Sequence, residues 1–247
     1  MASEIVTARE KNVGFITFNR PHLHNAISLE MWHAIPEMIE KLRGEGVQVI
    51  VFTGEGDSFA SGADLDELRK ISNTQDADRL WSAISNCLET VWSCEIPTIA
   101  MVHGACIGGG CLLATSCDFR LASFVSSFAI PVAKLGLVLD DRTVGRIVAA
   151  GGSVFARTLL YAGATIGARR AHELGYLYSA VELNKLRFEV MELAQAIAGN
   201  VQDSVLASKR AINNAANLSA LGTTVAHDRI VASYLTDEFK RRVKSSS

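Results

Sequence analysis

The pattern of apolar and polar positions changes character near residue 141. Before it, continuous apolar runs such as VQVIVFTG (47–54) and PTIAMVHG (97–104) alternate with segments of helical period, and both runs end in glycine. Continuous runs of this length are typical of strands that are buried on both faces of a parallel sheet. The alternation therefore predicts an α/β fold with a mainly parallel sheet and right-handed helical crossovers.

The first half of the chain contains signals for individual elements. Residues 3–9 and 13–18 flank a Lys-Asn turn and predict a hairpin. Ser28 stands where it caps a helix over 29–43, and a second helix is expected over 78–94. The other expected features are a loop at 54–68 and two short strands, FRLAS (119–123) and SSFAI (126–130).

The second half has helical periodicity almost throughout. Its helical segments are TVGRIVAAGG (143–152), SVFARTLLYAG (153–163), GARRAHELG (167–175), 185–199, 202–217 and 219–243. Glycines at 152, 163, 175 and 199 stand where helices of these lengths would end. We therefore expect an α/β core over 1–195 followed by a C-terminal helical region over 196–247.

Composition and charge argue against several classes of protein. The formal net charge of −2 gives no overall basic field that would attract nucleic acid or an anionic membrane. The five cysteines are an odd number without zinc-site spacing, so we expect reduced, buried thiols and no metal site. The N-terminus has no apolar signal core and no later stretch reads as a membrane span, so a cytoplasmic location is expected.

Two short stretches point to chemistry. SGADL (61–65) follows one buried strand, and GGGC (108–111) opens a helix after the next. Both lie at carboxyl ends of parallel strands, where open α/β sheets bind ligands. There the N–H groups of Ala63 and Gly109 are expected to converge on one oxygen as an oxyanion hole, aided by the helix dipole. The alternative is that the glycine triplet serves only the turn and its packing.

Four segments, in order, resemble the signature segments of the crotonase (enoyl-CoA hydratase/isomerase) superfamily: FNRPHLHNAIS (18–28), FASGADLDEL (59–68), IPTIAMVHGACIGGGCLLATSCDFRLA (96–122) and KLGLVLD (134–140). The resemblance implies a ClpP-like spiral of ββα units followed by C-terminal helices. It implies an acyl-CoA thioester substrate, with coenzyme A as part of that substrate and no permanently bound cofactor. It also implies a homotrimer, or a hexamer of two trimers, whose C-terminal helices form the trimerisation region and lie over the neighbouring site.

The resemblance also assigns roles to single residues. It implies that the amides of Ala63 and Gly109 hold the thioester carbonyl and stabilise an enolate. The residues expected to bind the substrate or its coenzyme A are His24, Ala26, Ser61, Asp64, Leu65, Asp66, Gly108, Leu112 and Val132.

Two positions depart from the hydratases of this superfamily. The residue after Gly-Gly-Gly-Cys, a glutamate in those enzymes, is Leu112, and the glutamate of their Pro-Glu pair is replaced by Val132. Water addition needs one group to activate water and another to manage the proton at C2. Leucine and valine can do neither, so ordinary hydration of a 2-enoyl-CoA is not expected.

Asp140 matches the aspartate of the Gly-Leu-x-x-Asp segment found in several isomerases of the superfamily. The match favours a proton shuttle with one carboxylate, in which Asp140 moves a proton between C2 and C4 while the oxyanion hole holds the dienolate. Asp141 is a second candidate, because a hydrolase of the superfamily carries its aspartate one place further on. The alternative for Asp140 is a helix N-cap. The Gly-Gly that continues the isomerase segment is Arg142-Thr143 here.

The expected function is therefore double-bond isomerisation of an enoyl-CoA. An atypical hydratase or hydrolase of the superfamily and a non-catalytic acyl-CoA-binding pseudoenzyme stay open as alternatives. Two further residues are expected to be structural: His103 as a hydrogen-bonding residue at a strand end and Asp118 as an anchor of a turn. Lys209 is expected on a solvated helix face, and the alternative is that it reaches the 3′-phosphate of a bound cofactor.

Overall fold

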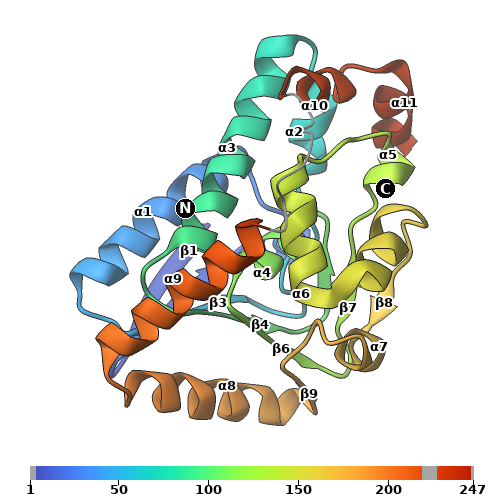
Figure 1. Cartoon of the computed structure of the whole chain (residues 1–247). Coiled ribbons are helices and arrows are strands. Elements are labelled where there is room, and N and C mark those ends of the chain that lie inside the picture. Colours follow the sequence, from blue (N-terminus) through green and yellow to red (C-terminus); the bar gives the residue numbers. More distant parts are fainter. Residues whose placement is uncertain (1–3, 219–226, 246–247) are drawn as a thin grey trace.

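The computed structural model describes residues 4–218 and 227–245 of the chain. Its main sheet has six strands in the order β1-β2-β3-β4-β6-β9 (Figure 1). β1 pairs antiparallel with β2, and every other pair in this sheet is parallel. These strands are β1 (Ile5–Glu10), β2 (Val13–Phe18), β3 (Val49–Gly54), β4 (Thr98–Val102), β6 (Phe119–Ser123) and β9 (Ser179–Val181).

A second, three-stranded sheet lies beside the first, with β5 and β8 on either side of β7. Its strands are β5 (Ala105–Ile107), β7 (Ser127–Ala129) and β8 (Ile166–Gly167). The helical elements are η1 (Pro21–Leu23), α1 (Leu29–Gly44), α2 (Leu65–Lys70), α3 (Thr74–Ser93), α4 (Gly109–Ser116), α5 (Val132–Leu135), α6 (Asp141–Leu160), α7 (Ala168–Glu173), α8 (Leu183–Ala198), α9 (Gln202–Leu218), α10 (His227–Ser233) and α11 (Asp237–Ser245). The mixed α/β architecture confirms the expected fold class.

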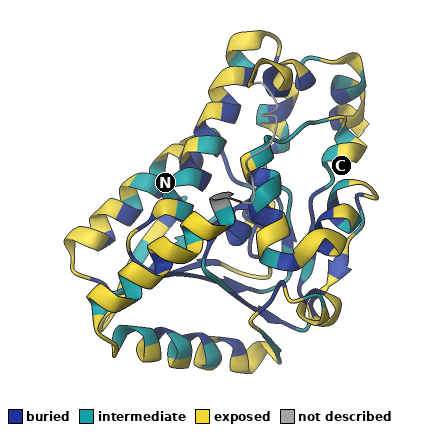
Figure 2. Ribbon diagram, viewed as in Figure 1, coloured by how far each residue is buried: buried dark blue, intermediate teal, exposed yellow. Residues whose placement is uncertain are grey.

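The main sheet is buried on both faces, which explains its continuous apolar runs. Ile50 and Phe52 of β3 join the large core cluster that includes residues of α1, α3 and α4. Val49 and Val51 point to the opposite face and pack in a second cluster with residues of α8, including Val190. Figure 2 shows the strands dark between these helical layers, whose outer faces are exposed.

The first half of the chain forms most of the expected elements. The hairpin is confirmed, and α1 is capped by Ser28, whose Oγ accepts a hydrogen bond from Met31 N at 3.2 Å. The second helix begins earlier than expected, at Thr74, because the side chain of Asn73 caps it there. The expected loop at 54–68 is wrong at its end, where Asp64 caps the short helix α2.

The second half is helical, with different boundaries from those expected. TVGRIVAAGG and SVFARTLLYAG belong to one element, α6, which is kinked at Gly152 with φ of 77°. Residues 219–226 lie outside the described residues, and the rest of the expected helix 219–243 forms α10 and α11, which are separate. The expected boundary at residue 195 falls inside α8, so the division into two regions stays a prediction.

The last two helices pack against their own chain. α10 contacts α3, while α11 contacts α2 and α5. α11 therefore stands beside α2, which carries part of the site described below. That the last two helices lie over a neighbouring site in a trimer stays a prediction. Among the described helices, none combines the length and apolarity needed to cross a bilayer. All five cysteines are free and buried, as expected.

Candidate active site

The amide of Ala63 is set by a short parallel pairing with the segment before α1. Ile27 N donates to Gly62 O at 2.8 Å, and Asp64 N donates to Ile27 O at 3.2 Å. Ile27 thus bonds to the carbonyl of Gly62 and to the N–H of Asp64, the residues on either side of Ala63. In a parallel pairing of this kind the N–H of Ala63 points away from Ile27. None of the described residues accepts a hydrogen bond from that N–H. Ala63 is partly exposed, and its amide is therefore available to a ligand.

The amide of Gly109 is set by the turn that follows β5. Gly108 N donates to Ala129 O at 2.8 Å, and Gly108 adopts φ of 52° and ψ of −120°. α4 begins at the next residue, so the N–H of Gly109 has no carbonyl one turn earlier to bond with. No side chain in the part of the chain that the structure describes caps this helix. The helix dipole places partial positive charge at the same point, which favours an oxygen carrying negative charge.

The two segments lie in contact with each other. A Cβ placed on Gly109 would lie 3.7 Å from Ala63 N, and one placed on Gly62 would lie 3.8 Å from Gly109 N. Glycine at 62 and 108 keeps side chains out of this contact. The arrangement brings both free amides to one region of the surface. That they converge on a single thioester oxygen stays a prediction.

Arg20 holds the loop on which Ala63 stands. Its guanidinium donates to Ala26 O at 2.8 Å and forms ion pairs with Asp64 at 2.9 Å and with Glu4 at 3.1 Å. Burial works to raise the pKa of Asp64, but Arg20 and the amides at the start of α2 outweigh it and hold that pKa below its usual value. Asp64 is therefore a charged anchor for the loop.

The other residues expected to contact coenzyme A lie in two adjoining loops. Ser61 N donates to His24 O at 3.0 Å, and Ser61 Oγ donates to Leu23 O at 3.3 Å. His24 is exposed, and its backbone adopts the left-handed conformation with φ of 49°. Leu65 is the first residue of α2, and the exposed Asp66 pairs with Arg69. Their roles in binding stay predictions.

Asp140 is the N-cap of α6. Its carboxylate accepts hydrogen bonds from Thr143 N at 2.6 Å and from Thr143 Oγ1 at 3.1 Å. Asp141 is the first residue of the helix. The cap that the sequence offered as an alternative for Asp140 is therefore present, and a catalytic role for either aspartate stays a prediction.

The two positions that depart from the hydratases lie on different helices, and one of them lies near α6. Leu112 is buried in α4, which packs against α6, and Val132 is the first residue of α5. Leu112 and Thr143 border the same narrow gap between the two helices. Thr143, which bonds to the carboxylate of Asp140, is therefore the residue that connects this acid to the gap bordered by Leu112.

Sequence reasoning missed the ion pairs that fix the start of α6. Arg146 is 6 % exposed and donates to Glu89 of α3 at 2.6 Å, and Arg142 donates to the same carboxylate at 2.7 Å. The guanidinium of Arg146 also lies 4.8 Å from the ring centre of Trp92. The spacing of the two arginines on one helix face was the signal in the sequence, but it does not reveal their partner.

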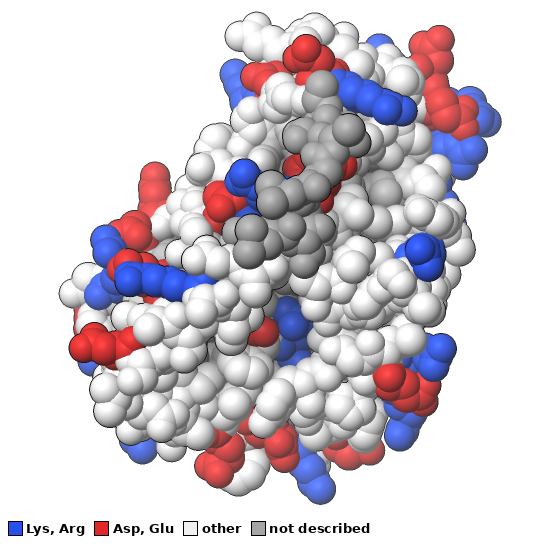
Figure 3. Space-filling model, in the orientation of Figure 1, with Lys and Arg blue, Asp and Glu red and all other residues white. Residues whose placement is uncertain are grey.

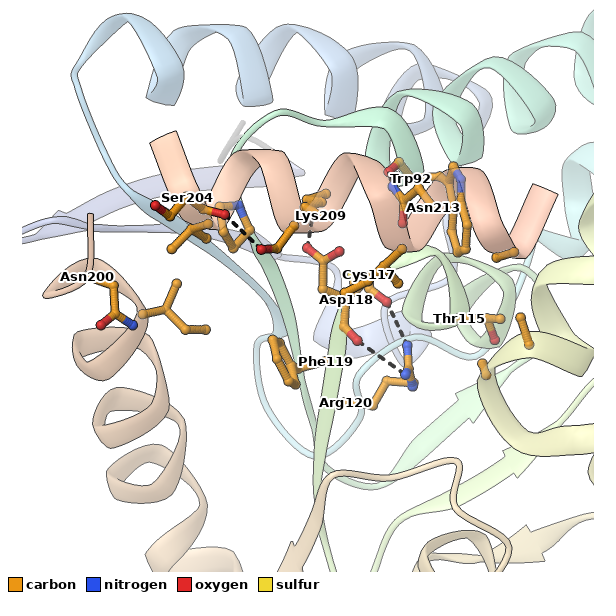
Figure 4. A pocket seen from close by; sticks show the side chains of 18 of the residues that line it. Trp92, Thr115, Cys117, Asp118, Phe119, Arg120, Asn200, Ser204, Lys209 and Asn213 are labelled. Carbon is orange, nitrogen blue, oxygen red and sulfur yellow. Dashed lines mark hydrogen bonds and ion pairs between the residues drawn. The ribbon is translucent and has the colours of Figure 1, made fainter. Parts of the chain in front are cut away.

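A large cavity lies elsewhere, between α9, α8, α6 and β6 (Figure 4). It has a volume of about 810 Å³, and neither Ala63 nor Gly109 lines it. Figure 3 shows the surface hollowed beside α9, with charged atoms inside the hollow and mostly uncharged residues around it. The free amides of the candidate site are therefore separate from this cavity.

Lys209 corrects an expectation. Its side chain is 8 % exposed, and its Nζ bonds to Asp118 at 2.7 Å and donates to Ile96 O at 3.0 Å, so the face of α9 that carries it is not solvated. Asp118 also accepts from Thr98 N at 2.7 Å, which confirms its role as an anchor. His103 Nε2 is 2.9 Å from Gly56 O, and burial lowers the pKa of the imidazole, in keeping with a hydrogen-bonding role.

Among residues 4–218 and 227–245, no group of three or more His, Cys, Asp or Glu side chains is placed to hold a metal ion. The candidate site is made of backbone amides at two loops and carboxylates at the start of α6.

Comparison with known proteins identifies the family. The profile described as enoyl-CoA hydratase/isomerase matches residues 8–246. The short-chain-enoyl-CoA hydratase of Clostridium acetobutylicum is 30% identical over 213 residues, which cover 85% of this chain and 81% of that protein. The mitochondrial Delta(3,5)-Delta(2,4)-dienoyl-CoA isomerase of Dictyostelium discoideum is 30% identical over 222 residues, which cover 83% and 76%. The crystal structure of an enoyl-CoA hydratase/carnithine racemase from Magnetospirillum magneticum superposes with a TM-score of 0.80 at 29% identity, covering 89% of this chain and 82% of that one. The chain therefore belongs to the enoyl-CoA hydratase/isomerase family.

Proposed function

We propose that the protein is an enoyl-CoA double-bond isomerase that works by enolate stabilisation and one aspartate base. The observation that carries the proposal is the presence of two main-chain amides, Ala63 and Gly109, that have no hydrogen-bond acceptor within residues 4–218 and 227–245, together with an acid at the start of α6. The related proteins include both hydratases and a dienoyl-CoA isomerase, so the family leaves the reaction open. The residues around the site favour isomerisation.

The proposed reaction conserves every atom of the substrate. Asp140 removes a proton from C2 of a 3-enoyl-CoA, and the electrons move into a dienolate whose oxygen is held by the two amides. The same carboxyl then delivers the proton to C4 and leaves the 2-enoyl-CoA. Each amide of such a pair typically contributes about 3–4 kcal/mol to lowering the barrier. One base suffices, because the proton that is removed is the proton that is returned.

The cap formed by Asp140 is compatible with this role. An ionised carboxylate has about four lone-pair sites, and the N–H and Oγ1 of Thr143 use two of them. The remaining sites can accept a proton from the substrate. Addition of water is disfavoured because neither Leu112 nor Val132 has a group that can activate it.

A second candidate function is binding of an acyl-CoA without turnover. It is favoured by the same contact, because Thr143 bonds to both oxygens of Asp140. If the carboxylate serves only the helix, the two amides form a thioester clamp that lacks a base.

The experiment that separates these functions combines a substrate and a variant. Purified protein is incubated with a 3-enoyl-CoA, and conjugation of the double bond is followed by ultraviolet absorbance. Asp140→Asn is the informative variant because asparagine caps helices as well as aspartate does but cannot act as the base. We expect it to lower kcat by about 10³-fold. Thr143→Val keeps the backbone part of the cap and is expected to stay within about tenfold of the parent.

Each outcome decides between named alternatives. Full activity in Asp140→Asn with loss in Asp141→Asn would assign the base to Asp141. Tight acyl-CoA binding by a parent that shows no turnover would favour the binding protein. Hydration of a 2-enoyl-CoA at a rate similar to isomerisation would overturn the proposal.

A further inference from the structure

Each glycine of the triplet at 108–110 is needed for a different reason. Gly108 has φ of 52°, a conformation that L side chains rarely adopt. A Cβ on Gly110 would lie 2.6 Å from the backbone oxygen of Ala60, so the neighbouring loop excludes it. Gly109 has neither constraint, because it stands in the right-handed helix α4 and no backbone atom crowds it.

The obstacle at Gly109 is the ring of Trp32. A Cβ on Gly109 would lie 2.8 Å from Cζ2 and 3.3 Å from Cη2 of that indole. Trp32 is completely buried in α1, so its ring has little freedom to move aside. The ring edge therefore packs directly on the residue whose amide is expected to hold the thioester oxygen.

The same short segment also holds the other amide. Ile27 forms the two backbone hydrogen bonds that orient Ala63, and Trp32 follows five residues later on the first turns of α1. The start of this helix is fixed by Ser28, which caps it, and by Glu67, which accepts from Leu29 N at 2.7 Å. One rigid segment, 27–32, thus contacts both loops of the site.

The indole N–H of Trp32 does not contribute a hydrogen bond to this contact. Its Nε1 is buried and has no partner among the described residues. An unpaired buried N–H costs stability. The shape of the ring against Gly109 is therefore the feature that distinguishes tryptophan from a smaller apolar residue here.

We propose that Trp32 is a positioning residue for the oxyanion hole: its ring edge sets the place of the Gly109 amide relative to the Ala63 amide, which Ile27 sets from the same segment. The proposal rests on the proposed function only in that Ala63 and Gly109 hold a thioester oxygen. It predicts that Gly109 is a glycine because of Trp32 and that a smaller side chain at 32 makes alanine tolerable at 109.

The test measures how much the carbonyl oxygen contributes to binding, independently of turnover. Calorimetry compares a saturated acyl-CoA thioester with the matching thioether, which lacks that oxygen. Two hydrogen bonds to the oxygen should give the parent a preference for the thioester of about tenfold or more. Trp32→Phe removes the ring atoms next to Gly109 and is expected to lower this preference to about threefold or less. Trp32→Met is a second variant, in which a flexible side chain of a different shape occupies the space of the indole ring.

A double mutant gives the sharper readout. Gly109→Ala alone is expected to abolish the preference for the thioester, and Gly109→Ala with Trp32→Phe is expected to recover part of it, because the smaller ring makes room for the methyl group. Trp81→Phe is the matched control. Trp81 is 3% exposed and lies in α3, and none of its atoms is among those nearest to a Cβ on Gly109. It should leave the preference unchanged even if it lowers thermal stability.

The results separate this inference from the proposed function. If Trp32→Phe and Trp32→Met keep the parental preference and the double mutant is no better than Gly109→Ala, the role of Trp32 is overturned while the oxyanion hole stands. If the parent itself does not distinguish thioester from thioether, the oxyanion hole fails, and both proposals fail with it.

Discussion

At the scale of single residues, the backbone around the site is packed too closely to admit side chains. Gly110 shows this most directly, because a Cβ there would lie 2.6 Å from the oxygen and 2.7 Å from the Cβ of Ala60. The atoms in the way belong to Ala60 itself, which is completely buried, and have no rotamer that relieves the contact. The start of α4 is therefore fixed against the loop that leads to Ala63.

Gly110→Ala is accordingly expected to destabilise the fold by about 2–3 kcal/mol, as overpacking of a buried site does. Gly44→Ala is the matched control, since Gly44 lies in α1 with nothing within 4 Å of the added Cβ. It should be neutral or stabilising by about 0.5–1 kcal/mol. Urea denaturation of both variants measures the difference, and equal stability of the two would contradict the packing seen at Ala60.

The sequence indicated some of the site residues and hid others. The glycine runs and the buried strands before them predicted where Ala63 and Gly109 lie, because strand ends can be read from local pattern. Trp32 gave no such signal, since only the folded chain brings it to Gly109. Lys209 was misread because a lysine on an amphipathic helix looks solvated until its partner, Asp118, is placed beneath it.

At the scale of elements, α6 depends on α3 for its position. Glu89 of α3 receives both Arg142 and Arg146 from the first turns of α6. Burial works to raise the pKa of Glu89, but the two arginines outweigh it and hold that pKa below its ordinary value of 4.5. The ion pairs of Arg142 and Arg146 with Glu89 thus hold the start of α6, which follows Asp140, against α3.

The pH dependence follows from the direction of this shift. A carboxyl whose pKa is lower in the folded state stabilises the fold fully above about pH 4.5, and this stabilisation is lost as the pH falls through the folded pKa. Glu89→Gln should therefore cost about 1–2 kcal/mol at pH 7, a value reduced by solvent screening because Glu89 is 41% exposed. The difference from the parent should shrink below pH 4.5.

Thermal denaturation between pH 3 and pH 7 tests this expectation. Glu173→Gln is the control, because Glu173 pairs with Arg170 on the surface, where both side chains are about 60% exposed. It should change stability by less than about 0.5 kcal/mol at any pH in this range. A cost of Glu89→Gln that stayed constant down to pH 3 would contradict the assigned ion pairs.

Element boundaries were the weaker part of the sequence prediction. The alternation of apolar runs predicted the parallel sheet because a strand buried on both faces leaves an unbroken run. Gly152 was expected to end a helix, but α6 continues past it through a kink, with φ of 77°. α2 was hidden in a loop because its six residues are too few to show a helical period.

At the scale of the whole molecule, a buried ion pair joins α9 to the core. Lys209 of α9 bonds to Asp118, the residue before β6, and to the carbonyl of Ile96, which lies before β4. Figure 4 shows this contact at the side of the large cavity under α9. Removing the lysine would leave the carboxylate of Asp118 without its buried cation.

Lys209→Met is therefore expected to destabilise the protein by about 2–3 kcal/mol, since a broken buried pair leaves an uncompensated charge. Arg210→Met is the matched control on the next residue, where the pair with Glu95 is exposed on both sides. It should cost no more than about 0.5 kcal/mol. Chemical denaturation measures both, and an equal cost for the two variants would show that α9 is held by other contacts.

The most direct test of the central claim is a crystal structure of the protein with a bound enoyl-CoA. We predict that the thioester oxygen lies about 2.7–3.1 Å from both Ala63 N and Gly109 N. A carboxylate oxygen of Asp140 should lie within about 3–4 Å of C2 and C4 of the acyl chain. A thioester oxygen beyond reach of either amide, or an Asp140 carboxylate turned away from the acyl chain, would contradict the proposed mechanism.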